Sequence, residues 1–376
     1  MHEDDWTRWA AARPHPSVLH LDTAAAGRAS SATLDATAAH ARLEAEAGGY
    51  VAEGRAAPVL DRLRRDVAGL LGSDVEGVAL VESATAALVA LLRVWPLPEG
   101  ASVGVAPGEW GPNLEILEHH GLTPVVLAAD ADGVLDLDAL EVRLRTEPPD
   151  VLLVDQVAAH RGLVQPADDV VALGRASGVP VWVDVAQSSG HVPLRGGDAV
   201  FGTSRKWLTG PRGVGMLAIA PDHRAALRVL RPAKHPDLPT VHQLDSGEAH
   251  VAGRVGLAVA VREHLGLGPD RVAERLREVG RLTREAIGSL GGWEVVRPGA
   301  PAGATSAIVP TAGQDAVRTQ ERLLQEHSIV TTACLPWRAP LESLPGLRPQ
   351  PMLRLSPHVD VTADDLERVC RALSGD

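Results

Sequence analysis

Lysine is nearly absent from this chain. Of its 36 lysine and arginine residues, only Lys206 and Lys234 are lysines. Lys206 lies in the glycine-containing segment 201–215, downstream of an apolar run, 181–183, that ends in Asp184. Arginine stays protonated in proteins, whereas lysine can lose its proton and form a Schiff base. Pyridoxal phosphate (PLP) chemistry requires such a pair of groups: an aspartate at the end of a strand and a lysine that follows it.

Asp184 and Lys206 would carry the central chemistry. Parallel α/β sheets bind ligands beyond the carboxyl ends of their strands, so Asp184 is positioned to hold a proton on a pyridine nitrogen. Gln187, three residues later, could reach the phenolic oxygen of the same ring. Taken singly, an aspartate is more simply a helix cap or an ion-pair partner, and a lysine or glutamine is more simply solvated. We interpret Lys234 in this simpler way, because it lies among prolines.

A phosphate group needs backbone N–H groups at a helix N-terminus, together with hydroxyls and a cation. Ser83, Ala84 and Thr85 stand between an apolar run and a helix-like segment, where they could supply the N–H groups and hydroxyls. Thr203 and Arg205, which lie close to Lys206 in the sequence, could supply the remaining hydroxyl and the cation of this phosphate site. An ordinary helix N-cap explains Ser83 equally well.

Two further residues could contact the cofactor and the substrate. Trp110, in the turn-rich segment 107–113, could stack on a pyridine ring, although a half-buried loop tryptophan is an alternative. Arg354, in the segment 352–358, has the forked shape that suits a substrate carboxylate, although a structural ion pair is an alternative.

Composition excludes several classes of function. The net charge of −12 leaves little basic surface to replace phosphate counterions, so we expect no nucleic-acid partner. Cys334 and Cys370 lack metal-ligand spacing, so we expect no metal site and a reduced, cytoplasmic protein. The acidic N-terminus lacks the apolar region of a signal peptide, and we find no apolar stretch long enough to span a membrane.

The order of apolar and amphipathic segments predicts the scaffold that positions these residues. Short Val-rich runs predict strands at 77–81, 102–106, 124–127, 151–154, 181–184, 199–202 and 215–218. Helical patterns separate them at 84–94, 113–120, 137–144 and 167–176. This alternation predicts an α/β fold with a mostly parallel sheet covered by helices on both faces.

A second region should form a smaller α+β domain. Its predicted helices are 251–261, 270–290, 314–326 and 363–373, and its predicted strands are 294–296, 306–309, 329–332 and 352–355. The Pro- and His-containing stretch 231–244 predicts a connector. We therefore expect an N-terminal segment, a large domain and a small domain, at residues 1–18, 19–245 and 246–376.

Together these residues resemble the class V aminotransferase-like enzymes of the fold type I PLP group. The resemblance rests on Ala84-Thr85, Asp184-x-x-Gln187, Thr203-Ser-Arg-Lys206 and Arg354-Leu-Ser-Pro-His358, and it covers nearly the whole chain. It implies a seven-stranded, mostly parallel sheet, a smaller C-terminal domain and a homodimer. It also implies that Lys206 is the Schiff-base lysine, that Trp110 stacks on the ring and that Arg354 binds the α-carboxylate.

Four segments are similar to a more specific set of relatives, the carbon–sulfur lyases of ergothioneine biosynthesis: 20–25, 45–51, 108–114 and 159–166. This similarity implies β-elimination from an amino-acid sulfoxide, with an external thiol that reduces the released sulfenic acid. An acidic or aromatic wall should receive the cationic end of this substrate, with Tyr50, Trp337 and Glu46 as candidates, and His160 is a further candidate substrate contact.

Several departures separate the chain from the cysteine desulfurases of the same family. Cys334 is not framed by their Arg-x-Gly-x-x-Cys pattern, and Ala158 and Ala159 stand where they carry an asparagine. The segment 245–250 replaces their Gly-Thr element. A desulfurase, an epimerase, an aminotransferase or a catalytically silent binding homologue remain the alternative functions.

Overall fold

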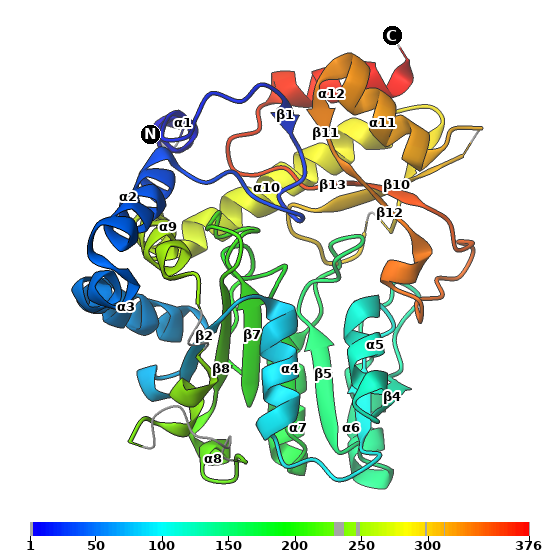
Figure 1. The fold of residues 1–376 in the computed structure, drawn as a ribbon. Helices are drawn as coiled ribbons and strands as arrows, with labels where there is room; N and C mark the ends of the chain where they lie inside the picture. The colour runs from blue at the N-terminus through cyan, green and yellow to red at the C-terminus, as the bar shows by residue number, and fades with distance from the viewer. Residues whose placement is uncertain (1–2, 229–236, 246–248, 298, 312, 376) are drawn as a thin grey trace.

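The computed structural model describes residues 3–228, 237–245, 249–297, 299–311 and 313–375, and Lys234 lies outside these ranges. A seven-stranded sheet forms its centre (Figure 1). In spatial order the strands are β2 (Val78–Val81), β8 (Gly215–Ile219), β7 (Ala199–Thr203), β6 (Val181–Asp184), β5 (Val151–Asp155), β3 (Ser102–Val105) and β4 (Thr123–Val126). Only β8 runs antiparallel to its neighbours, which confirms the predicted α/β fold with a mostly parallel sheet.

Alternation along the strands places apolar side chains on both faces of this sheet. On β5, Leu152 and Val154 join one buried cluster, whereas Val151 and Leu153 join another. The first face is covered by α3 (Gly49–Leu70), α6 (Leu137–Thr146), α7 (Ala167–Ser177) and α9 (Val251–Leu267). The second face is covered by α4 (Ala84–Val94) and α5 (Gly111–His119). Burial on both faces explains why the strands are almost continuously apolar.

The C-terminal region builds a second, antiparallel sheet above the first (Figure 1). Its strands, in spatial order, are β12 (Thr332–Cys334), β13 (Met352–Leu355), β10 (Ser306–Pro310) and β9 (Trp293–Val295). It packs with α10 (Pro269–Gly288), α11 (Ala316–His327) and α12 (Ala363–Ser374) around an apolar core that includes Ile308 and Leu353. A short helical turn, η3 (Pro336–Arg338), follows β12.

One predicted strand, 329–332, is divided in the structure. Its first half is β11 (Ile329–Val330), which pairs in parallel with β1 (Leu19–His20), near the start of the chain. The remainder belongs to β12 in the second sheet. The N-terminal helices α1 (Glu3–Ala11), α2 (Ser31–Ala47) and α3 lie outside the predicted pattern of strands and helices.

Two shorter elements complete the described chain. The turn helix α8 (Pro221–Arg224) follows β8, and η1 (Val75–Gly77) precedes β2. The described part of the predicted connector contains η2 (Thr240–Leu244). Among the described residues, no helix combines the length and apolar character that crossing a membrane would require.

Candidate active site

A cavity of about 280 Å³ opens at the carboxyl ends of the central strands. All nine residues predicted to contact the cofactor line it: Ser83, Ala84, Thr85, Trp110, Asp184, Gln187, Thr203, Arg205 and Lys206. They come from segments more than 120 residues apart, and the parallel order of the strands brings their ends to one edge. The structure therefore assembles the cofactor-binding set that the sequence predicts.

Lys206 lies three residues beyond the end of β7 and places its amine in this cavity. Removal of the amine from water lowers its pKa to about 7, and the nearby carboxylate of Asp184 opposes this decrease. The cationic groups of Arg205 and Arg354 lower it further. An amine with a pKa near 7 is partly unprotonated at neutral pH, so it can act as a nucleophile or a general base.

Asp184 ends β6 on the same cavity, and burial raises the pKa of its carboxyl group. Hydrogen bonds from the backbone N–H of Ala186 (2.7 Å) and from the Asn113 amide (3.0 Å) oppose this rise, as does the charge of Lys206. These donors favour the ionised carboxylate and fix its orientation. An anion held in this way can keep a proton on a pyridine nitrogen.

Sequence reasoning missed three residues of this site: Asn113, Glu109 and Asp155. The Asn113 side chain bonds both Asp184 and Glu109, and Asp155 lines the cavity beside Asp184. A signal was present, because Glu109 and Asn113 are four residues apart, as on one helix face, and Asp155 ends a Val-rich strand as Asp184 does.

The first turn of α4 forms the candidate phosphate site. Ser83 is the N-cap, and its hydroxyl accepts a hydrogen bond from the N–H of Ala86 (3.0 Å). The N–H groups of Ala84 and Thr85 precede the first complete turn, so the helix provides them with no carbonyl partner. Gly215 approaches closely here, since a Cβ at that position would lie 2.4 Å from the Ser83 carbonyl carbon. Ser83 therefore both caps the helix and borders the cavity.

Gln187 and Trp110 border the space expected for the ring. The Gln187 amide nitrogen donates to the carbonyl of Ala24 (3.0 Å), and its oxygen accepts from the Trp207 indole (3.2 Å). These bonds orient the amide, which retains one N–H for a ligand. Trp110 is the N-cap residue of α5, and its ring centre lies 6.0 Å from that of Trp337.

Arg354 lies on β13 and is almost fully buried. Its guanidinium donates to the carbonyl of Ala159 (2.7 Å) and pairs with Asp22 (2.9 Å). The structure thus contains the ion pair that was the alternative interpretation of this arginine. Its charge lowers the pKa of Lys206, but Arg354 is not among the residues that line the Lys206 cavity.

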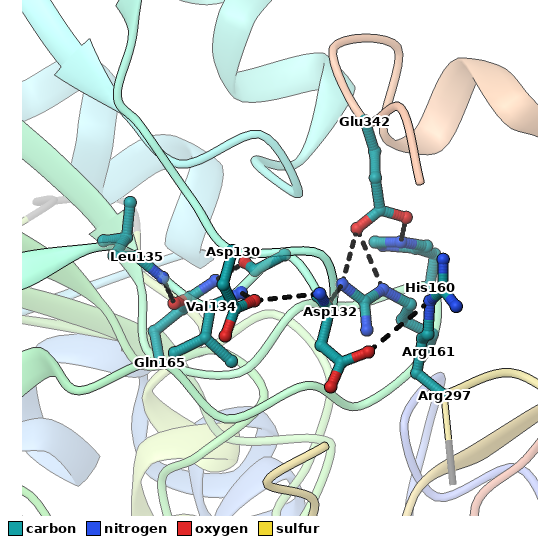
Figure 2. Close-up of polar contacts among 10 residues, drawn as sticks. Asp130, Asp132, Val134, Leu135, His160, Arg161, Gln165, Arg297 and Glu342 are labelled. Carbon is teal, nitrogen blue, oxygen red and sulfur yellow. Dashed lines mark hydrogen bonds and ion pairs between the residues drawn. The ribbon is translucent and has the colours of Figure 1, made fainter. Parts of the chain in front are cut away.

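The predicted substrate contacts His160 and Tyr50 have different surroundings. Figure 2 shows Glu342 pointing toward His160 and Arg161, at 2.6 Å from the His160 Nε2 and 2.8 Å from the Arg161 guanidinium.

Tyr50 does not reach the cavity within one chain. Its side chain is 86% exposed, because the first turn of α3 faces solvent. A role for Tyr50 at the site would require a second subunit.

Cys334 ends β12 and is buried. Burial raises the pKa of its thiol, although the charges of Arg354 and Arg338 act in the opposite direction. Cys334 lines a separate cavity with His160 and Trp337, and it is not among the residues that line the Lys206 cavity. A thiol in this state is poorly suited to act as a nucleophile.

The donor set fits PLP. Lys206 offers an amine for the aldehyde, Asp184 an anion for the ring nitrogen, and the first turn of α4 offers N–H groups for the phosphate. Gln187 and Trp110 would lie against the ring, and Thr203 and Arg205 would add a hydroxyl and a cation. Bound PLP supplies an electron sink for bonds that break at the α-carbon of an amino acid.

Comparisons with known proteins identify the family of this chain. A family model for class V aminotransferases matches residues 19–369. The chain is 44% identical to a probable hercynylcysteine sulfoxide lyase of Mycobacterium tuberculosis, over 97% of this chain and 92% of that protein. It is 28% identical to isopenicillin N epimerase of Amycolatopsis lactamdurans, over 98% of both.

A solved cysteine desulfurase from Escherichia coli shares the fold, with a TM-score of 0.85 and 21% identity over 98% of both chains. The family model spans nearly the whole sequence and includes the Lys206 cavity. The predicted cofactor is thereby confirmed, and the chain belongs to the class V aminotransferase family of PLP-dependent enzymes.

Proposed function

We propose that this enzyme is a carbon–sulfur lyase that cleaves hercynylcysteine sulfoxide by β-elimination. The observation that carries the proposal is the amine of Lys206 beside Asp184 in a cavity whose lining includes neither cysteine. The 44% identity to a probable lyase for that compound supports the choice of substrate.

Lys206 would remove the proton from the substrate α-carbon, because its pKa near 7 leaves part of the amine unprotonated. Asp184 would hold the proton on the ring nitrogen throughout. The electron pair released at the α-carbon would expel the sulfoxide sulfur from the β-carbon as a sulfenic acid. The remaining three-carbon fragment would hydrolyse to pyruvate and ammonia, and an external thiol would reduce the sulfenic acid to ergothioneine.

The substrate carboxylate would bind Arg354, whose guanidinium is shared with Asp22 in the structure. The fixed positive charge of the hercynyl group would meet the Trp110–Trp337 pair. The guanidinium carbon of Arg338 lies 5.4 Å from the first ring centre and 5.3 Å from the second, so the substrate cation would have to displace Arg338 from these rings. His160, which lines the separate cavity together with Trp337, would contact the middle of the substrate.

A homodimer in the cytoplasm is the proposed working state. Exposed apolar side chains on α2 and α3, among them Leu34, Tyr50 and Val51, support an association surface on these helices. Such a surface would give Tyr50 its only route to a substrate, at the site of the partner subunit.

The test is a product assay with hercynylcysteine sulfoxide and a reducing thiol. Wild type should release equal amounts of pyruvate and ergothioneine without an added keto acid. Lys206→Ala should lower this rate by at least about a hundredfold. Pyruvate release by Lys206→Ala at a rate comparable to wild type would disprove the assignment. Alanine formation from free cysteine would instead identify a desulfurase.

A further inference from the structure

Three carboxyl groups meet at the candidate active site, although PLP chemistry needs only one. Asp155 and Asp184 end the neighbouring strands β5 and β6 and are register partners in the sheet. Glu109 precedes α5 and approaches from the adjoining loop. The exposed fractions are 0% for Glu109, 5% for Asp155 and 6% for Asp184. Three neighbouring buried anions would repel each other strongly, so some of these groups must be protonated.

The Asn113 amide fixes two of the three carboxyl groups. Its nitrogen donates one hydrogen to Glu109 Oε1 (2.9 Å) and the other to Asp184 Oδ2 (3.0 Å). Both accepting oxygens must therefore be unprotonated on the side that faces Asn113. This geometry favours Asp184 as an anion and leaves the second oxygen of Glu109 for another partner.

That second partner is Asp155. Glu109 Oε2 and Asp155 Oδ2 are both buried, and neither has a hydrogen-bond partner if both groups are counted as ionised acceptors. The two side chains are within hydrogen-bonding reach of each other. A single proton satisfies both oxygens, whereas two carboxylates would leave two buried acceptors unpaired.

The electrostatics of the pair agree with one shared proton. Burial and the neighbouring carboxylate raise the pKa of Asp155 well above its ordinary value. Burial also raises the pKa of Glu109, while the hydrogen bond from Asp155 opposes this rise. The charged groups that act on this cluster are Asp184, from β6, and Lys206, beyond β7. Among the described residues, no cluster of three or more acidic, His or Cys side chains is arranged to hold a metal ion.

We propose that Asp155 is a positioning residue that stays protonated, donates a hydrogen bond to Glu109 and, through Glu109 and Asn113, holds Asp184 as the anion for the cofactor ring. The chain of contacts runs from Asp155 to Glu109, then to Asn113, and then to Asp184. Its negative charge resides on Glu109 and Asp184, and Asp155 contributes a hydrogen rather than a charge. The role is independent of the substrate, so it does not depend on the lyase proposal.

The test is a pH titration of the absorbance of bound PLP in the holoenzyme, without substrate. Negative charge near the lysine nitrogen that bears the cofactor favours its protonated form, so the midpoint pH reports the charge of the cluster. Asp155→Asn keeps an N–H donor for Glu109 and should leave the midpoint unchanged. Asp155→Ala removes the donor, so that Glu109 takes up a proton and one negative charge is lost.

Asp155→Ala should therefore lower the midpoint by about one pH unit and weaken PLP binding by about tenfold. Asp138→Asn, on the exposed surface of α6, is the matched control and should change neither. An equal decrease in Asp155→Asn and Asp155→Ala would overturn the proposal, because Asp155 would then be an anion. An unchanged midpoint in Asp155→Ala would also overturn it. If Asp155→Ala fails to fold, the midpoint of Asp155→Asn alone decides between the two charge states.

Discussion

The guanidinium of Arg354 lies 2.9 Å from the carboxylate of Asp22, and this ion pair joins β13 to the segment that follows β1. A substrate carboxylate that binds Arg354 must therefore share it with, or take it from, Asp22. This competition makes the forked geometry of arginine important, since its several N–H groups can serve two carboxylates and the Ala159 carbonyl at once.

Arg354→Lys should raise KM by about tenfold or more, because lysine keeps the charge but loses the planar fork. Steady-state kinetics of pyruvate release measure the change. Arg318→Lys, on the exposed face of α11, is the matched control and should leave KM unaltered. An unchanged KM in Arg354→Lys would show that the ion pair with Asp22 is the whole role of this arginine.

Cys334→Ser should leave the rate of pyruvate release within about twofold of wild type. Burial raises the pKa of this thiol, and the proposed elimination uses no cysteine. The same product assay measures the rate, with Cys370→Ser as the control. A loss of more than tenfold in Cys334→Ser alone would favour a nucleophilic thiol and the desulfurase alternative.

Glu342→Gln should destabilise the fold by about 3 kcal/mol, because it leaves the guanidinium of Arg161 buried without its anion. His160 and Arg161 hold the pKa of Glu342 at about 2, below its ordinary value of 4.5, although burial acts in the opposite direction. The stabilisation is therefore fully present above about pH 4.5 and is lost as the pH falls toward 2.

Urea titrations at pH 7 and at pH 3 measure this difference. Glu367→Gln is a suitable control, since its ion pair with Arg371 is exposed and should contribute less than about 1 kcal/mol. If both variants lose the same free energy of unfolding, the buried network does not support the segment that carries Glu342.

In the protein without PLP, burial of the Lys206 amine should lower the free energy of unfolding. The pKa of about 7 in the folded state lies below the ordinary value of 10.5, so between these pH values the unfolded chain binds more protons. Stability of the cofactor-free protein should therefore rise as the pH increases from about 7 to about 10.5. At pH 6 the penalty should be at most ~5 kcal/mol.

Lys206→Met should be more stable than wild type at pH 6, and the difference should shrink as the pH rises. Thermal unfolding of both cofactor-free proteins across this range measures the effect. A constant difference at all pH values would contradict the depressed pKa of the lysine.

Gly27→Ala should reduce cofactor occupancy. A Cβ on Gly27 would lie 2.3 Å from the carbonyl oxygen of Lys206 and 2.9 Å from Thr209, so the backbone that carries the lysine would have to move. Gly54→Ala, on α3, meets nothing within 4 Å and is the control. The ratio of absorbance from bound PLP to protein concentration measures occupancy, and an equal ratio in both variants would contradict the prediction.

Local sequence patterns were sufficient for most elements of the central sheet. The helix 84–94 and the strand 181–184 match the predicted bounds, because Ser83 caps the first and Asp184 interrupts the apolar run of the second. Helix α2 was less visible, since its many alanines weaken the contrast between buried and exposed faces. Helix α3 contains Pro58 and three glycines, residues that usually indicate a break in a helix.

Site residues were predictable where the residue type, or its place at the end of a strand, indicates a chemical role. Lys206 stands out by type, and Asp184 by its place at a strand end. Asp155 also ends a Val-rich run, but its place beside Asp184 follows only from the neighbouring positions of β5 and β6, which local patterns do not supply. Likewise, Arg354 and Asp22 are 332 positions apart, and nothing in either segment indicates the other.

The parallel pairing of β1 with β11 has a consequence for synthesis on the ribosome. Leu19 leaves the exit tunnel about 300 residues before its partner Ile329 exists. At roughly 5–20 residues per second, the first strand waits on the order of tens of seconds without its neighbour. The stretch 19–27, with Asp22 and Gly27, therefore reaches its final position only at the end of translation, so a truncated nascent chain would lack a finished pocket.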